Sequence, residues 1–501
     1  MSVHARARTK SLLAVVAAAS LMLGACSNSD DDQPAAAEPT APQSTVPEAS
    51  DPTAPTAPAT TKPDDATPDD TSTADTTADD TTPATTAPAA GPDLGEFQPV
   101  SGVPGVTDEE IQFAVVGTGP SNPAGYCLLE CYLGGVKAYF DYRNSLGGVH
   151  GRQLTLTHEV DDELANTQVR MLELIGADDV FGIFVASLIP AGFAEAAAAS
   201  VPLYSLVQSG PAAAGHENAF VPGLFCPDCL RQSVVHQAQL VGATKVATLG
   251  LGASQASVDC VSLTEQAVNT WGPELGIEHV YANATLPFGM PNGVAPEVTA
   301  MKDLGVDFIS LCIDQNGALT IEQEMARQGL ADVPVLLPQG YPDAQFVAAN
   351  AELLEGDVLS LFVRPFEADQ TDTDIPQMVQ AITSGGYTFN DQTVQGWINA
   401  DMAVTGLLAA GPQFDRAGVI AATNAIAGYD AGGVFTRVDF TKQHTAYTGE
   451  TMISDGPDTF CAALVRVEGG AFTLIGDPDA PFFEYSWDRD WVEPVASNCR
   501  A

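Results

Sequence analysis

The segment from Ile111 to Asp162 most constrains the fold of this chain. A mainly apolar run opens it at Ile111–Val116, and a short run rich in β-branched residues is typical of a buried strand. A loop rich in Gly, Pro, Ser and Asn follows, and apolar spacing then predicts a helix over Leu133–Asn144. A second strand, Gln153–Thr157, completes a β-loop-α-β unit. Such a unit predicts a parallel sheet that binds ligands at the carboxyl ends of its strands.

Strands and helices alternate through the rest of the chain. Further strands are predicted at Val180–Val185, Pro202–Leu206, Lys245–Leu249, His279–Ala282, Asp307–Ile313, Val333–Leu337, Leu359–Arg364, Val434–Phe440, Phe460–Val467 and Phe472–Ile475. Helices are predicted at Asn166–Leu174, Gly192–Ser200, Val258–Thr270, Pro296–Leu304, Ile321–Gln328 and Gln392–Ala410. This alternation predicts an α/β protein with two similar series of elements.

The first 26 residues predict export. Arg6, Arg8 and Lys10 precede an apolar run, Leu12–Leu23, that is too short to span a bilayer comfortably. The run ends in Leu-Gly-Ala-Cys at Cys26, which resembles a bacterial lipobox, and the alternative is an ordinary signal peptide with a coincidental Cys. The resemblance implies that Cys26 is lipidated, which would anchor the protein to the outer face of the bacterial cytoplasmic membrane.

Residues 27–104 form a segment of Pro, Thr, Ala, Ser and Asp with almost no aromatic residues. Such a composition buries too little apolar surface to offset the entropy of ordering the chain. We therefore expect a disordered linker that acts as a spacer.

The chain has nine cysteines, and eight remain if Cys26 carries lipid. An even number in an exported protein favours disulfides. The close spacing predicts the pairs Cys127–Cys131 and Cys226–Cys229, which would leave Cys260–Cys312 and Cys461–Cys499 as the other two. A zinc site made of the two close pairs is the alternative, although no histidine adjoins either pair.

Charge and motifs exclude several functions. A net charge of −45 argues against nucleic-acid binding, because phosphates would be repelled. The chain lacks the GxSxG, HExxH and Walker motifs. We therefore predict no enzyme activity, no cofactor and no metal, with a secreted hydrolase as a remote alternative. The paired acids Asp161 and Asp162 are expected to lie on a solvated face.

The opening unit resembles a known family. Its helix ends near Gly147-Gly148-Val149 and Gly151-Arg152, and its second strand leads to Asp161-Asp162. This series is similar to the start of extracytoplasmic solute-binding proteins of the branched-chain amino acid ABC transporter family. Gly396–Met402 and Ala199–Leu203 add to the resemblance.

The resemblance implies the type I periplasmic-binding-protein fold, which has two Rossmann-like lobes joined by three hinge crossings. Residues 105–222 and 363–440 would form lobe one, and residues 223–362 and 441–499 would form lobe two. A solute would bind between the lobes, at the carboxyl ends of the strands.

The resemblance also implies which residues bind the solute. Ser187, Ser209 and the backbone near Val207 would hold a carboxylate. Gln339 stands where the amino-acid binders place an acid for the ammonium group, so Asp314 would have to replace that acid or the solute would lack an ammonium. The full predicted set is Ser121, Ala186, Ser187, Val207 and Ser209 in lobe one, and Asp314, Gln339 and Tyr341 in lobe two.

The predicted function is therefore capture of a small polar solute of the amino acid, amide or carboxylate type. A monomeric protein would deliver it to the permease of an ABC importer. A ligand sensor acting with a membrane receptor and a purely structural surface protein are the alternatives.

Overall fold

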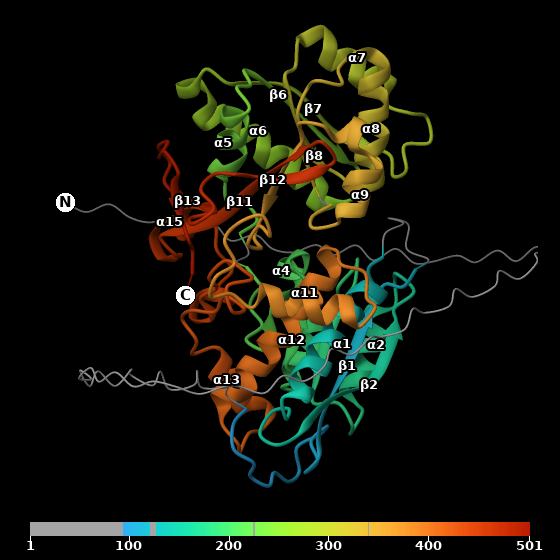
Figure 1. The fold of residues 1–501 in the computed structure, drawn as a ribbon, viewed down its shortest axis with the longest axis vertical. Coiled ribbons are helices and arrows are strands. Elements are labelled where there is room, and N and C mark those ends of the chain that lie inside the picture. Colours follow the sequence, from blue (N-terminus) through green and yellow to red (C-terminus); the bar gives the residue numbers. More distant parts are fainter. Residues whose placement is uncertain (1–93, 121–126, 224–225, 339, 501) are drawn as a thin grey trace, which may run out of the picture. The chain divides into compact units, whose positions relative to one another are not determined.

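Two β-sheets with helices packed on them make up the part of the chain that this computed structural model describes, residues 94–120, 127–223, 226–338 and 340–500 (Figure 1). The first sheet has five parallel strands in the order β2-β1-β3-β4-β5. The strands are β1 (Glu110–Gly117), β2 (Gln153–Asp161), β3 (Gly182–Ala186), β4 (Leu203–Ser205) and β5 (Ala219–Phe220).

The second sheet has nine strands, and its main path runs β14-β13-β11-β10-β9-β8-β6-β7, with β12 paired to β11. The strands from β6 to β10 are parallel, whereas β11 to β14 pair antiparallel. Their bounds are β6 (Lys245–Leu251), β7 (Glu278–Leu286), β8 (Phe308–Cys312), β9 (Val335–Leu337), β10 (Val358–Leu361), β11 (Thr459–Glu468), β12 (Ala471–Ile475), β13 (Phe482–Ser486) and β14 (Val495–Ser497).

The helices that surround the first sheet come from both ends of the chain, because α1 packs on α11 and α12, more than 200 residues later. The helices between β1 and β5 are α1 (Leu129–Ser145), α2 (Thr167–Ile175), α3 (Phe193–Ala198), the 3₁₀ turn η1 (Val207–Ser209) and α4 (Gly210–Ala213). The helices between β5 and β10, in the series of the second sheet, are α5 (Gln232–Leu240), α6 (Gln255–Leu275), α7 (Ala295–Leu304), α8 (Gln315–Gln328), α9 (Ala344–Ala349) and α10 (Ala351–Leu354). The helices between β10 and β11 are α11 (Ile375–Ser384), α12 (Asp391–Ala410), α13 (Arg416–Thr423), α14 (Phe440–Gln443) and α15 (Gly449–Asp455).

Strand β1 shows why the first sheet is covered on both faces. Successive side chains of a strand point to opposite faces. Phe113 and Val115 pack in the core cluster that contains α1 and α12, whereas Ala114 and Val116 pack in the cluster that contains α2 and α3. All four are fully buried, so the strand is apolar on both faces, as parallel strands are.

The chain passes between the two sheets three times, and we call these passages the crossings. The first links β5 to α5, the second links β10 to α11, and the third links α13 to β11. The predicted lobe boundaries, after residues 222, 362 and 440, stay a prediction, and each lies within one crossing.

The prediction of a strand at Val434–Phe440 is wrong. This segment of the third crossing makes only single bridges, Val363 to Phe435 and Tyr429 to Val438. Its neighbouring N–H groups donate in different directions, from Thr436 to the Phe362 carbonyl and from Arg437 to the Cys499 carbonyl. A backbone that bonds to several segments in turn cannot form one ladder.

Candidate functional site

A fully buried carboxylate, Asp162, lies at the carboxyl edge of the five-stranded sheet. Its Oδ2 accepts hydrogen bonds from the hydroxyls of Ser187 (2.5 Å), Thr167 (2.9 Å) and Thr118 (3.2 Å). A charge out of water needs such donors, because burial without them costs several kcal/mol. The expectation that Asp162 faces solvent is therefore wrong.

Ser187 serves this network. Its hydroxyl lies 2.9 Å from Thr167 Oγ1 and accepts from the N–H of Ile189 at 3.2 Å. The neighbouring acid, Asp161, also binds the backbone, because its Oδ1 accepts from the N–H groups of Gly119 (3.0 Å) and Glu163 (2.8 Å). Asp161 and Asp162 together thus hold the loops that follow β1, β2 and β3 to one another.

Hydrogen bonds within the chain also hold the residues at the end of β4. The Ser209 hydroxyl is buried and lies 2.7 Å from Ser205 Oγ, from which it accepts. The N–H of Val207 donates to Gln395 Oε1 of α12 at 3.3 Å. Ala186 is buried, and its carbonyl accepts from Thr118 N–H at 2.9 Å. Each of these predicted residues therefore already has a hydrogen-bond partner within the chain.

The second sheet contributes two of the predicted residues. Asp314 caps α8, where its side chain accepts from Gly317 N–H at 3.0 Å. Tyr341 is buried; its hydroxyl donates to Glu367 Oε2 at 3.1 Å and accepts from Phe366 N–H at 2.5 Å. Burial and the Glu367 charge raise the pKa of Tyr341 well above its usual value. Ser121, Gln339 and Cys26 lie outside the described residues.

A cavity of about 830 Å³ lies where the crossings meet, and we call it the crossing cavity. All three crossings line it, through Pro222 and Arg231, through Phe362, and through Phe435 to Lys442. Residues near the carboxyl end of the chain, Ser497 to Arg500, complete the wall. Of the predicted site residues that the structure describes, Val207 alone lines this cavity.

Arg231 has an unusual environment on the wall of the crossing cavity. Its guanidinium carbon lies 5.5 Å from the ring centre of Phe460, and 5.9 Å from those of Phe362 and Trp487. The side chain is partly buried, and this burial lowers the pKa of Arg231. Cation–π contacts of this kind attract the guanidinium charge but supply no hydrogen-bond acceptor for its N–H groups.

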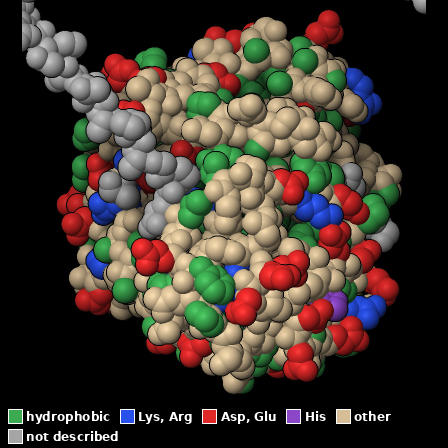
Figure 2. Space-filling model, turned by 60° about the horizontal axis from the view of Figure 1, so that its bottom comes forward, with side chains coloured by type: hydrophobic (Ala, Val, Ile, Leu, Met, Phe, Trp, Pro, Cys, Tyr) green, Lys and Arg blue, Asp and Glu red, His purple; other side chains and the backbone are tan. Residues whose placement is uncertain are grey.

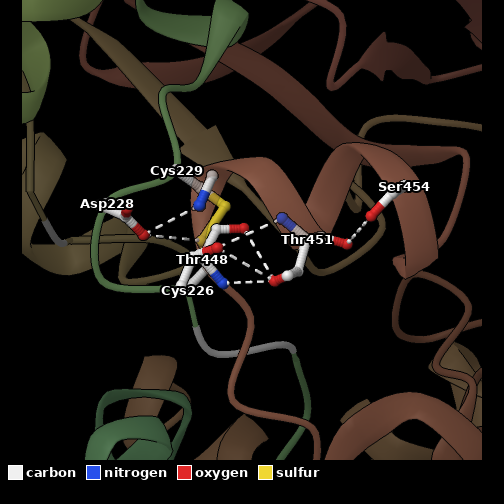
Figure 3. The surroundings of a disulfide bond; sticks show 7 residues. Cys226, Asp228, Cys229, Thr448, Thr451 and Ser454 are labelled. Atoms are coloured by element: carbon white, nitrogen blue, oxygen red, sulfur yellow. Dashed lines mark hydrogen bonds between the residues drawn. A yellow bond between two sulfur atoms is a disulfide. The ribbon is translucent and has the colours of Figure 1, made fainter. Parts of the chain in front are cut away.

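Two disulfides fix the surroundings of the cavity. Cys461–Cys499 joins β11 to the carboxyl-terminal segment, and both residues line the cavity. Cys226–Cys229 lies in the first crossing, where Asp228 accepts from Gly449 N–H at 3.0 Å and so fastens the crossing to α15 (Figure 3). Cys127–Cys131 and Cys260–Cys312 are the other two bonds, so the pairs are those named from the sequence.

Sequence reasoning missed both Arg231 and the burial of Asp162. The cavity wall is assembled from residues between Val207 and Arg500, and no spacing along the chain connects them. For Asp162 a signal existed, because Thr118 and Ser187 also follow predicted strands and so had to meet it at one edge.

Within the described ranges, no group of three or more His, Cys, Asp or Glu side chains is placed to hold a metal ion. Among the helices of the described residues, none is both long and apolar enough to cross a membrane.

Comparison of folds finds solved structures of binding proteins. A fatty acid ABC transporter substrate-binding protein from Thermomonospora curvata shares 17% identity over 76% of this chain and 96% of its own, with a TM-score of 0.56. A solute-binding protein from R. palustris in complex with 4-hydroxybenzoate shares 16% identity over 75% of this chain and 98% of its own, with a TM-score of 0.56. A branched-chain amino acid ABC transporter protein from Thermus thermophilus with bound valine shares 15% identity over 74% and 96%, with a TM-score of 0.55.

At these identities the solved structures show a shared fold, the type I fold of periplasmic binding proteins. A comparison with curated protein sequences found no match. The family model described as periplasmic binding protein matches residues 116–470, which is more than half of the chain. The chain belongs to the periplasmic binding protein family.

Proposed function

We propose that this protein captures a small solute between its two lobes and delivers it to an ABC importer. The observation that carries the proposal is the family match, together with two sheets joined by three crossings. Two lobes on such crossings can close over a solute by hinge motion, and binding then shifts the protein towards the closed form.

The solute is proposed to carry a carboxylate. The ligands named for the similar structures are valine and 4-hydroxybenzoate, and one relative is called a fatty acid transporter protein. All three are carboxylic acids or their salts, although they differ in size and in the presence of an ammonium group. This supports the wider class over a strict preference for amino acids, in keeping with Gln339 in place of an acid.

The site is proposed at the strand ends predicted from the sequence, with Ser121, Ala186, Ser187, Val207 and Ser209 on one side and Asp314, Gln339 and Tyr341 on the other. Since Ser187 and Ser209 already bond within the chain, we assign them the role of fixing the loops that shape the site. We also propose that Cys26 carries the lipid anchor and that residues 27–104 act as the spacer.

A thermal-shift screen followed by an uptake assay tests the proposal. The protein is heated with amino acids, amides and short or aromatic carboxylates, and a solute at about 100 times its Kd should stabilise the protein by about 2.7 kcal/mol, a shift of several degrees. Cells that lack the protein should then lose uptake of the tightest solute. Normal uptake in those cells would contradict delivery and favour the sensor alternative.

A further inference from the structure

We propose that the crossing cavity is a second binding site, for a small organic carboxylate that Arg231 anchors. Among the described residues, Val207 is the one that this site shares with the strand-end site of the proposed function, and the inference does not depend on that function. Four features of the cavity carry it: an unpartnered cation, its aromatic surroundings, the local charge, and the size.

The first feature is the missing partner of Arg231. Three other enclosed arginines donate to backbone carbonyls: Arg152 to Thr107 at 2.6 Å, Arg364 to Asp369 at 2.8 Å, and Arg416 to Phe181 at 3.0 Å. Arg231 has neither a hydrogen bond nor an ion pair to any residue that the structure describes. Buried and partly buried charges are normally paired, so a partner from outside the described residues is expected.

The second feature is the aromatic surroundings of that cation. The guanidinium carbon lies 5.5 to 5.9 Å from the ring centres of Phe362, Phe460 and Trp487, and these rings offer no oxygen acceptor to its planar fork of N–H groups. A carboxylate matches this fork with two parallel hydrogen bonds. The same rings form an apolar wall for the body of the ligand, and the Trp487 indole N–H also lacks a partner.

The third feature is the concentration of positive charge. Four of the 19 basic residues of the chain line this one cavity: Arg231, Arg437, Lys442 and Arg500. Elsewhere the protein is acidic, and Figure 2 shows acidic side chains spread over the face in view. An anion is therefore repelled by most of the molecule and attracted here.

The acids on the cavity wall do not cancel this attraction. Asp439 caps α14 by accepting from Thr441 N–H at 3.0 Å, and Glu484 accepts from the Thr459 hydroxyl at 2.6 Å. Asp458 is exposed. Two of the basic residues are engaged as well, Arg500 with Asp430 at 3.1 Å and Lys442 with the Gly456 carbonyl at 3.0 Å. Arg231 thus remains as the inner cation without a partner among the described residues.

The fourth feature is size. A volume of about 830 Å³ lies within the usual range of small-molecule sites, roughly 300–1,000 Å³. Residues from all three crossings line the cavity, so its shape depends on how the three pack together.

Titration of the full chain with 4-fluorobenzoate, followed by ¹⁹F NMR, tests the inference. We expect saturable binding, and 4-fluorobenzamide, which has the same ring without the charge, should bind far more weakly. Arg231→Gln should weaken benzoate binding by about 30-fold or more, the lower end for removing one partner of an enclosed charge pair. Arg231→Lys keeps the positive charge but lacks the planar fork of N–H groups, so its affinity for 4-fluorobenzoate should lie between those of the unchanged protein and Arg231→Gln.

Arg327→Gln is the matched control, because Arg327 is an exposed arginine of α8 away from the cavity; it should bind the probe as the unchanged protein does. Melting curves of every variant report folding, and Arg231→Lys answers the question if Arg231→Gln does not fold. Absence of saturable binding would overturn the inference. Equally tight binding by Arg231→Gln would also overturn it, because the probe would then bind without Arg231. The uptake assay tests the proposed function separately.

Discussion

Asp162 and Arg231 are both charged groups removed from bulk water, and the protein treats them in opposite ways. Three hydroxyls of the chain surround the Asp162 carboxylate, whereas three aromatic rings surround the Arg231 guanidinium and leave its N–H groups without an acceptor. A charge satisfied by its own chain holds a structure together. A charge left open is suited to an external partner.

The comparison is tested most strongly at Asp162. Asp162→Ala removes the acceptor of three buried hydroxyls, and unsatisfied buried donors are expensive, so the free energy of unfolding should fall by about 2–4 kcal/mol. Urea denaturation measures this change. Asp141→Ala on α1 removes an exposed carboxylate and should change the free energy of unfolding by less than about 0.5 kcal/mol. An equally small change for Asp162→Ala would contradict the structural role.

A further effect, seen as a dependence of stability on pH, is expected at a pair of buried acids that has no cation beside it among the described residues. Glu322 and Asp357 are each 2% exposed. Burial raises the pKa of Glu322 from 4.5 to about 8, and burial together with the Glu322 charge raises the pKa of Asp357 well above its usual value. The native pair thus keeps a proton that the unfolded chain releases.

Stability from this proton is fully present below about pH 4.5 and is lost as pH rises towards 8. The slope should approach about 1.4 kcal/mol per pH unit for one proton. Glu322→Gln should reduce this slope of the free energy of unfolding against pH, as measured by urea denaturation between pH 5 and 8. Glu352→Gln on α10, which changes an exposed acid, should leave the slope as it was, and an unchanged slope in Glu322→Gln would show that the pair does not titrate in this range.

The smallest effect is expected at Arg231 itself, in the absence of any ligand. Replacing a poorly partnered charge by an apolar side chain of similar length is often neutral, so Arg231→Met should keep the free energy of unfolding within about 1 kcal/mol. Arg152→Met is the matched comparison, since the Arg152 guanidinium is buried and donates to three carbonyls. That change should cost about 3 kcal/mol. A similar loss for both variants would mean that Arg231 is structural.

Much of the fold was predictable because parallel strands are apolar on both faces. The predicted strand Ile111–Val116 lies within β1, and Gln392–Ala410 lies within α12. Helix starts were less accurate, because the polar first turn and its cap lie outside the apolar repeat from which a helix is predicted. The helix predicted from Ile321 begins at Gln315, where Asp314 caps it, and the helix predicted from Val258 begins at Gln255, where Ser254 caps it.

The site was less predictable, for a physical reason. Strand-end loops follow a rule of topology, so their residues could be named in advance from the sequence. The crossing cavity depends on how three distant passages pack against β11, β13 and the carboxyl-terminal segment. Strands β13 and β14 are short and were not predicted, and without them the wall that carries Trp487 could not be anticipated.

Trp487 also gives the protein a built-in optical reporter. The chain has four tryptophans, and of these only Trp487 lines the crossing cavity in the described structure. Indole emission depends on the polarity and charge next to the ring, so an anion arriving at Arg231 would alter the fluorescence of one tryptophan against three constant ones. The unlabelled protein can therefore report occupancy of this cavity in real time, and a Trp487→Phe variant supplies the blank.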